Sequence, residues 1–131
     1  MLISRVLALS SVLVMLSLAK FGNAITTGTG QATFYAPGLG ACGHVNTDQD
    51  FIVAVSRELF DTFPGATANP NANPVCNQPL TANFEGQTVT VTVVDRCEGC
   101  QINDIDLSPT AFQQLASLDA GRLSGVTWTI G

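Results

Sequence analysis

The sequence predicts a mainly β domain, a small barrel of six short strands with one or two brief helices. Several segments alternate apolar and polar residues with the period of a strand. Two of them are joined by a two-residue turn, and one later stretch carries apolar residues at helical spacing. Strands this short, with brief helices among them, fit a barrel better than a sandwich of regular hairpins.

Residues 1–24 predict a secretory signal peptide. The apolar run Val6–Ala19 is 14 residues long, which is shorter than the roughly 18–20 residues that span a bilayer. The predicted signal peptide ends in the small residues Gly22-Asn23-Ala24, which suit cleavage after Ala24. A signal anchor is the alternative. We therefore expect a secreted, extracellular protein.

The remaining residues, 25–131, form an acidic domain. They hold three arginines and ten acidic residues, a net charge of −7. Nucleic-acid affinity depends on many cationic contacts to phosphate, which three arginines do not supply. The domain also lacks a polybasic segment for an anionic membrane surface. We expect neither nucleic acid nor a membrane as a partner, and we expect a monomer.

The boundary of the domain is predicted at residue 31. Residues 25–30 are small and polar, which predicts a flexible N-terminal tail followed by a barrel domain over 31–131. Gln31–Tyr35 alternates as a strand, with Phe34 and Tyr35 on opposite faces.

The middle of the chain predicts a buried strand and a surface loop. Phe51–Val55 is a continuous apolar run, which is typical of a strand buried on both faces, and Ser56–Phe60 predicts one helical turn. Gly65–Pro74 is rich in Asn and Pro without an apolar period, which predicts a loop.

The second half predicts a hairpin, a helix and a closing strand. Leu80–Phe84 and Gln87–Val94 flank Glu85-Gly86, whose glycine suits a primed turn. Ser108 and Pro109 are typical of a helix cap and first helical position. The remaining elements are a short strand over Ile105–Leu107, a helix over Pro109–Leu118 and a strand over Gly125–Ile130.

The four cysteines predict two disulfides, because an exported domain meets an oxidising environment. They are Cys42, Cys76, Cys97 and Cys100, and the residues themselves leave three pairings open. A zinc site with His44 as a further ligand is the alternative. We expect no metal and no cofactor.

Four short motifs follow one another along residues 30–131. They are Gly30–Tyr35, Gly40–Gly43, Val93–Cys100 and Asp106–Phe112. In this order they resemble RlpA-like double-psi β-barrel proteins, especially small secreted fungal forms related to expansins, loosenins and barwin. They are also similar to bacterial inhibitors of papain-type proteases. The resemblance implies a six-stranded double-psi barrel with an open polar groove, which holds polysaccharide in expansins and related endoglucanases.

The resemblance also assigns candidate groove residues. Thr33 and Tyr35 match groove-lining positions, and Asp106 matches the general acid of the related hydrolases. Asp95, which ends a valine-rich strand, is either a further groove residue or a carboxylate that caps a loop or forms an ion pair. Related barrels imply a Cys42–Cys76 bridge, which leaves Cys97 to pair with Cys100.

The hydrolytic mechanism of these relatives needs a second carboxylate to activate water. In their motif it lies just after the positions of Thr33 and Tyr35, where this sequence has no acid until Asp48. We therefore expect non-hydrolytic binding or loosening of a cell-wall polysaccharide, so that enzymatic activity is uncertain. The alternatives are inhibition of papain-like proteases and lytic cleavage of a glycan with Asp106 as the acid. Neither the polymer nor the protease follows from the sequence.

Three other features have less direct interpretations. Trp128 is expected in the core rather than on a sugar ring. His44 is a minor candidate for catalysis. Asn46–Asp50 has oxygen donors at alternating positions but lacks the glycine and distal glutamate of an EF-hand, so we expect it to cap the following strand.

Overall fold

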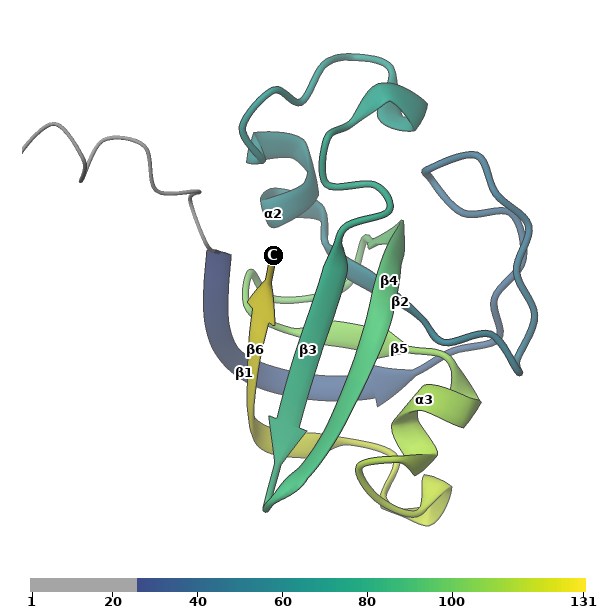
Figure 1. Ribbon diagram of the computed structural model, residues 1–131, viewed down its shortest axis with the longest axis vertical. Helices are drawn as coiled ribbons and strands as arrows, with labels where there is room; N and C mark the ends of the chain where they lie inside the picture. Colours follow the sequence, from purple (N-terminus) through teal and green to yellow (C-terminus); the bar gives the residue numbers. More distant parts are fainter. Residues whose placement is uncertain (1–25) are drawn as a thin grey trace, which may run out of the picture.

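The computed structural model describes residues 26–131, and six strands of this part close into a barrel (Figure 1). Around the barrel they follow the order β1, β5, β2, β4, β3, β6. Their bounds are β1 Thr26–Phe34, β2 Ile52–Ser56, β3 Pro79–Phe84, β4 Gln87–Cys97, β5 Ile105–Leu107 and β6 Leu123–Ile130. The predicted fold class, a mainly β six-stranded barrel, is confirmed.

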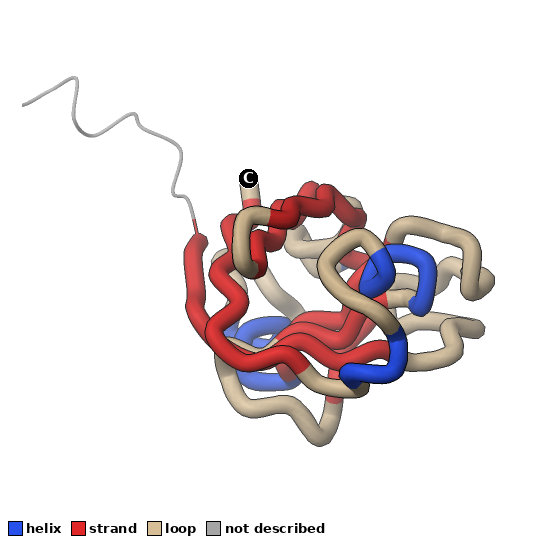
Figure 2. Tube along the Cα trace, turned by 90° about the horizontal axis from the view of Figure 1, so that it is seen from below, coloured by secondary structure: helices blue, strands red, loops and turns tan. Residues whose placement is uncertain are grey.

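Short helical segments lie outside the ring of strands, as Figure 2 shows. They are the α-helices α2 (Arg57–Thr62) and α3 (Pro109–Gln113) and the 3₁₀ turns η2 (Pro70–Ala72) and η3 (Leu118–Ala120). Within residues 26–131, no helix has the length and apolar character needed to cross a membrane.

The strands are interleaved rather than paired in sequence order. β1 runs parallel to β5, and β2 runs parallel to β4. The other four pairs, β1 with β6, β2 with β5, β3 with β4 and β3 with β6, are antiparallel. As a result β1, β5, β2 and β4 are adjacent and build one wall of the barrel from distant parts of the sequence.

Alternating side chains fill the barrel. In β4, Val89, Val91 and Val93 are at most 5% exposed, whereas Thr88 and Thr90 on the opposite face are exposed. β2 is buried on both faces as its apolar run predicts. The indole of Trp128 is in the core, and its Nε1 donates a hydrogen bond to the Asn103 carbonyl over 2.8 Å, so it is not free to stack on a sugar.

The prediction of a flexible tail over 25–30 is wrong for residues 26–30, because β1 begins at Thr26 and pairs with β6. A Cβ atom at Gly28 would collide with the Trp128 ring, and one at Gly30 would collide with the Asn103 carbonyl. The small residues therefore permit close packing, and the barrel begins at residue 26. Ile25 and the predicted signal peptide, 1–24, lie outside the described residues.

The predicted hairpin has the expected turn. Glu85 and Gly86 both have positive φ, 46° and 83°, as a type I′ turn requires. The predicted loop 65–74 contains only the turn η2.

The helix that forms in the predicted segment 109–118 is shorter than the row of apolar residues that predicted it. Ser108 caps α3 by accepting from Ala111 N over 3.2 Å, and α3 ends at Gln113. Leu115 remains buried and Leu118 packs against the core, so these apolar residues reach the core from a turn and from η3.

Both disulfides implied by the resemblance are present. Cys42 is bonded to Cys76 across 34 positions, and Cys97 is bonded to Cys100 across three. The thiolates that the alternative zinc site would need are therefore used in covalent bonds.

Candidate functional site

Four residues from four adjacent strands lie in one row across the barrel wall. Thr33 of β1 is opposite Asp106 of β5, Asp106 is opposite Ala54 of β2, and Ala54 is opposite Asp95 of β4. Their neighbours Ala32, Val53, Val93 and Ile105 belong to the core, so the row faces the outside of the barrel. We call these four residues, together with Tyr35, the site row.

A β-bulge in β4 places Asp95 in this row. Val53 pairs with Val93, but the next residue of β2, Ala54, pairs with Asp95. Val94 is thus an extra residue on β4, and it shifts every later side chain by one position. Without the bulge, valine rather than a carboxylate would lie opposite Ala54.

Tyr35 and Asp95 are joined across the row. The Tyr35 backbone N donates to the Leu107 carbonyl over 3.0 Å, which extends the β1–β5 pairing beyond the end of β1. Its hydroxyl donates to Asp95 Oδ2 over 3.2 Å. Burial raises the pKa of Tyr35 far above its ordinary value, and the Asp95 charge and hydrogen bond add to the effect. The phenol is therefore a neutral donor.

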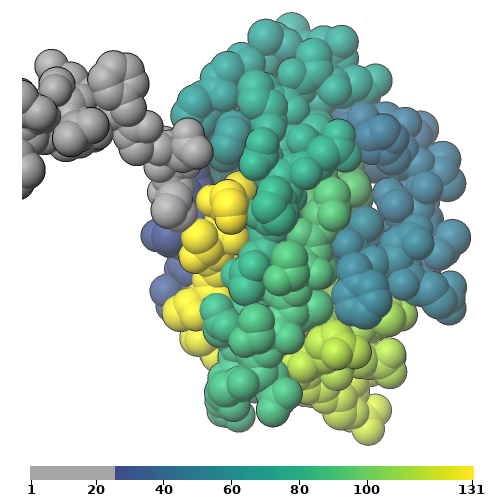
Figure 3. Space-filling model, in the orientation of Figure 1, coloured from purple at the N-terminus to yellow at the C-terminus, as the bar shows by residue number. Residues whose placement is uncertain are grey.

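Asp95 also holds the loop that follows β1. Its Oδ1 accepts hydrogen bonds from Ala41 N and Arg96 N, each 2.8 Å long. A Cβ at Gly40 would lie 2.5 Å from the Val94 carbonyl oxygen and 3.3 Å from the Asp95 Cβ, so only glycine fits where the loop crosses β4. The loop of residues 36–51 forms a ridge along one side of the barrel (Figure 3).

Asp106 accepts fewer hydrogen bonds than Asp95, the other carboxylate of the row. Its Oδ1 accepts from the Thr33 hydroxyl over 2.9 Å, and within the described residues its Oδ2 accepts no hydrogen bond. Burial raises the pKa of Asp106, the Thr33 hydrogen bond opposes this, the Asp95 charge raises the pKa further and Arg122 lowers it. Asp106 thus holds a proton at a higher pH than an ordinary aspartate.

Other charged residues near the row have structural roles. Arg96 pairs with Asp61 and Glu98, over 2.8 and 2.9 Å, rather than with Asp95. Asp104, two positions before Asp106, accepts from the backbone of Gln31 and of Gln101. Of the two interpretations of Asp95, the contacts show a carboxylate that caps the loop, and it also accepts from Tyr35, a predicted groove residue.

The site row contains all four predicted groove residues, Thr33, Tyr35, Asp95 and Asp106, together with Ala54, which the sequence reasoning missed. Ala54 is 2% exposed, and it lies between the two aspartates in the strand register. Its one available signal is the small side chain inside a run of larger apolar residues. His44 is exposed and makes no side-chain hydrogen bond to the row within residues 26–131.

No metal-binding group is formed by the described residues: between 26 and 131, no three His, Cys, Asp or Glu side chains are placed to hold an ion. In the segment 46–50, which was expected to cap the following strand, Asp50 Oδ2 accepts from Thr47 N over 2.9 Å and from Asn46 Nδ2 over 3.2 Å, so these side-chain contacts cap the turn before the strand.

Comparison with known proteins relates this barrel to others. A family model described as lytic transglycolase matches residues 27–127. The papain inhibitor of Streptomyces mobaraensis is 37% identical over 103 residues, which cover 76% of this chain and 68% of the inhibitor. An EG45-like domain containing protein of Citrus jambhiri is 34% identical over 119 residues, which cover 86% of this chain and 88% of that protein.

Two solved structures share the fold. The Streptomyces papain inhibitor has a TM-score of 0.73 at 34% identity, over 81% of this chain and 96% of the inhibitor. A mutant Clavibacter michiganensis expansin in complex with cellohexaose has a TM-score of 0.63 at 27% identity, over 81% of this chain and 50% of the expansin. The chain thus spans half the length of that expansin. Taken with the barrel topology, these matches show that the chain belongs to the lytic transglycolase family of RlpA-like double-psi β-barrel proteins.

Proposed function

We propose that this protein is a secreted, non-hydrolytic carbohydrate-binding or wall-loosening protein that holds a cell-wall polysaccharide along the site row. The observation that carries the proposal is the alignment of Thr33, Asp106, Ala54 and Asp95 on four adjacent strands. Both hydroxyl protons are donated within the row, from Thr33 to Asp106 and from Tyr35 to Asp95. The hydroxyl and carboxylate oxygens on this outer barrel face therefore act as acceptors for sugar hydroxyls.

Two further observations support this ligand class. The expansin structure that resembles this chain is a complex with cellohexaose. Lys and Arg number only five in the sequence, so an anionic polymer would meet little complementary charge. A neutral polysaccharide is therefore the preferred ligand.

The contacts of Asp95 argue against hydrolysis. An inverting hydrolase needs one acid and one base that activates a water between them. Asp95 is the carboxylate across Ala54 from Asp106, but it already accepts three hydrogen bonds, from Tyr35, Ala41 and Arg96. These contacts fix it as a loop anchor and leave little capacity to bind and deprotonate water.

A lytic reaction is the alternative at the same site, because it needs an acid but no base that activates water. The burial that raises the pKa of Asp106 favours the protonated form that a general acid requires. The family model that the chain matches is described as lytic transglycolase.

Inhibition of a papain-like protease is a second candidate function, and a different surface favours it. Leu39 and Val45 face each other in an isolated β-bridge and are 74% and 75% exposed. The segment between them contains Cys42, which is bonded to Cys76. A rigid, disulfide-anchored pair of apolar side chains suits a protein partner.

One set of assays separates these functions. We compare the wild-type protein, Asp106→Asn and the loop variant, which combines Leu39→Ser with Val45→Ser. For each protein we measure pull-down on insoluble cellulose and chitin, papain inhibition, and release of soluble sugar. We expect polymer binding that Asp106→Asn weakens and the loop variant leaves intact, without sugar release. Stoichiometric papain inhibition without polymer binding would overturn the carbohydrate proposal, and loss of that inhibition in the loop variant would assign it to the apolar pair. Sugar release abolished by Asp106→Asn would establish the lytic reaction.

A further inference from the structure

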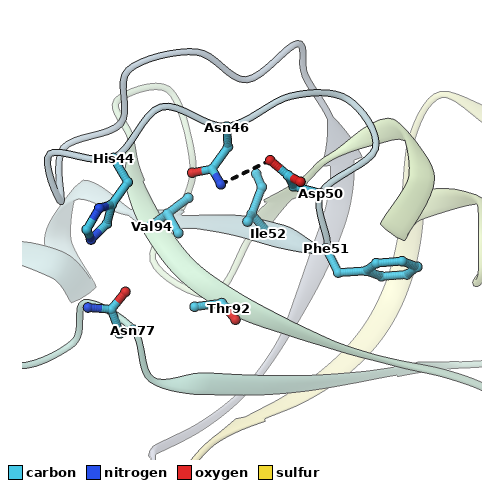
Figure 4. A pocket seen from close by; sticks show the side chains of 8 residues that line it. All are labelled: His44, Asn46, Asp50, Phe51, Ile52, Asn77, Thr92 and Val94. Atoms are coloured by element: carbon cyan, nitrogen blue, oxygen red, sulfur yellow. Dashed lines mark hydrogen bonds between the residues drawn. The ribbon is translucent and has the colours of Figure 1, made fainter.

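An open pocket lies beside the site row, beneath the loop that follows β1 (Figure 4). Its volume is about 330 Å³, which is at the small end of the range for ligand pockets. None of the residues of the site row lines it. The lining residues are His44, Asn46, Asp50, Phe51, Ile52, Asn77, Thr92 and Val94.

The chain itself separates this pocket from the site row. Ile52 precedes Ala54 by two positions on the same face of β2, a distance of roughly 7 Å along a strand. Between the pocket and the site row, the loop of residues 36–51 crosses β4. There Cys42 N donates to the Val94 carbonyl over 3.1 Å, and Ala41 N donates to Asp95. The two sites therefore share a barrel wall but not a cavity.

A buried amide oxygen in this pocket lacks a partner. Asn46 Nδ2 donates to Asp50 Oδ2 over 3.2 Å, which orients the amide so that its oxygen turns away from Asp50, as Figure 4 shows. Within residues 26–131, this Oδ1 atom is buried without a hydrogen-bond donor. A buried acceptor without a donor is unfavourable. Because this oxygen is closed to solvent, a ligand hydroxyl or N–H would reach it only after the Asn46 side chain turns toward the pocket.

The other lining groups supply both donors and acceptors. The side chains of Asn77, Thr92 and His44 make no hydrogen bonds within the described residues. The backbone N of Asn77 donates to the Val93 carbonyl over 2.8 Å, which fixes the position from which its amide can reach a ligand. A cation would use only the acceptors of this set, whereas a hydroxyl both donates and accepts.

Apolar groups complete the pocket. Ile52 and Val94, each 4% exposed, form part of its lining, and Phe51, 44% exposed, stands at the end opposite His44 (Figure 4). An aliphatic surface with an aromatic ring at the rim suits the C–H faces of a pyranose, while its hydroxyls meet the polar groups.

We propose that this pocket, in which the side chains of Asn77 and Thr92 adjoin an apolar surface, binds one ring of a neutral saccharide as a second site independent of the site row. The proposal shares its ligand class with the proposed function but none of its residues. Its volume suits a single ring rather than several units of a chain.

The test is a two-dimensional NMR titration of the ¹⁵N-labelled exported protein. Cellotetraose and chitotetraose are the saccharide probes, and a short acetylated peptide with one lysine is the cationic probe. We expect a saccharide to shift the side-chain amide signals of Asn46 and Asn77 and the backbone signal of Thr92. Pocket signals that stay unchanged with both saccharides, or that shift only with the lysine peptide, would overturn the proposal.

Two variants confirm the location. Thr92→Val removes a hydroxyl at constant shape, and Asn77→Gly removes the amide while tolerating the positive φ of 68°. Each should weaken saccharide binding about two- to tenfold, the effect of one lost hydrogen bond. Thr90→Val, two positions earlier on the same strand and outside the pocket, is the matched control and should bind normally. Unchanged affinity in both pocket variants would place the ligand elsewhere and refute the proposal.

The same spectra separate this proposal from the proposed function. Saccharide-induced shifts in the pocket alone would support the second site and contradict binding at the site row. Shifts at Thr33, Tyr35 and Asp106, with unchanged pocket signals, would support binding at the site row and contradict the second site.

Discussion

The hydroxyl of Tyr35 donates a hydrogen bond to Asp95 Oδ2 over 3.2 Å, between residues that are 60 positions apart in the sequence. The same carboxylate accepts from Ala41 N over 2.8 Å. One side chain near the end of β4 therefore fixes both Tyr35, a predicted groove residue, and the loop beside it. The consequences of this arrangement can be measured.

Tyr35→Phe should keep the fold and lose about 1 kcal/mol of unfolding free energy, the net value of a typical hydrogen bond. The ring still packs, but Asp95 Oδ2 loses its donor. Polymer binding should weaken, because the phenol oxygen, an acceptor for a sugar hydroxyl, leaves the site row. Denaturant unfolding and cellulose pull-down check this, and unchanged stability together with unchanged binding would contradict the role given to the phenol.

Thr33→Val should raise the pKa of Asp106 further. The Thr33 hydroxyl donates to the carboxylate and lowers its pKa, in opposition to burial, so its removal leaves the effect of burial less opposed. Carbon-13 NMR of the Asp106 carboxyl against pH measures the change. Thr127→Val, an exposed threonine of β6, is the control that should leave this titration unchanged.

Asp106→Asn should increase stability at neutral pH, and the gain should fade as the pH falls below about 4, the ordinary range for aspartate. Folding raises the pKa of Asp106, so the native state binds the proton more tightly than the unfolded chain. The contribution of Asp106 to the stability of the wild-type protein therefore falls as the pH rises from the unfolded-state pKa through the native one. Urea unfolding from pH 3 to 8 tests this, and an equal difference between the proteins at every pH would show that titration is not the cause.

Gly40→Ala should destabilise the loop by about 1–3 kcal/mol, because its methyl group would press on the Val94 carbonyl and Asp95. Binding at the site row should fall with it, since the loop would move away from Asp95. Gly38→Ala is the matched control, because a Cβ there meets no atom within 4 Å. Thermal unfolding of the two variants distinguishes a steric effect from a general loss of glycine, and equal stabilities would contradict the close approach.

The two disulfides should differ in their contribution to stability. Removal of the Cys42–Cys76 bridge with paired alanines opens a loop of 34 positions and should cost about 4 kcal/mol in the chain-entropy model. Removal of Cys97–Cys100, which spans three positions, should cost about 2 kcal/mol. Reversible denaturant unfolding of both double variants tests the order, and a larger loss for the shorter loop would contradict it.

Local chemistry in the sequence determined the elements that depend on neighbours along the chain. The alternation of Val and Thr in β4 predicted its buried and exposed faces, Glu85-Gly86 predicted the primed turn, and Ser108 predicted the start of α3. The motif resemblance identified three of the four groove candidates, Thr33, Tyr35 and Asp106, and the disulfide pairing, and Asp95 was a candidate from its place at the end of a valine-rich strand. These features need only short-range periodicity, turn conformation and capping, or positions within a motif.

Only the tertiary structure decided what depends on distant residues. The glycines before residue 31 look like a flexible tail until Trp128 and Asn103 pack against them. The bulge at Val94 and the placement of Ala54 between two aspartates follow from strand register, which the local pattern does not specify. Two of the three hydrogen bonds that occupy Asp95 likewise come from segments separated by 54 and 60 positions. Register and close approach are set by packing between remote parts of the chain, so the sequence predicts the site residues but not how they are arranged.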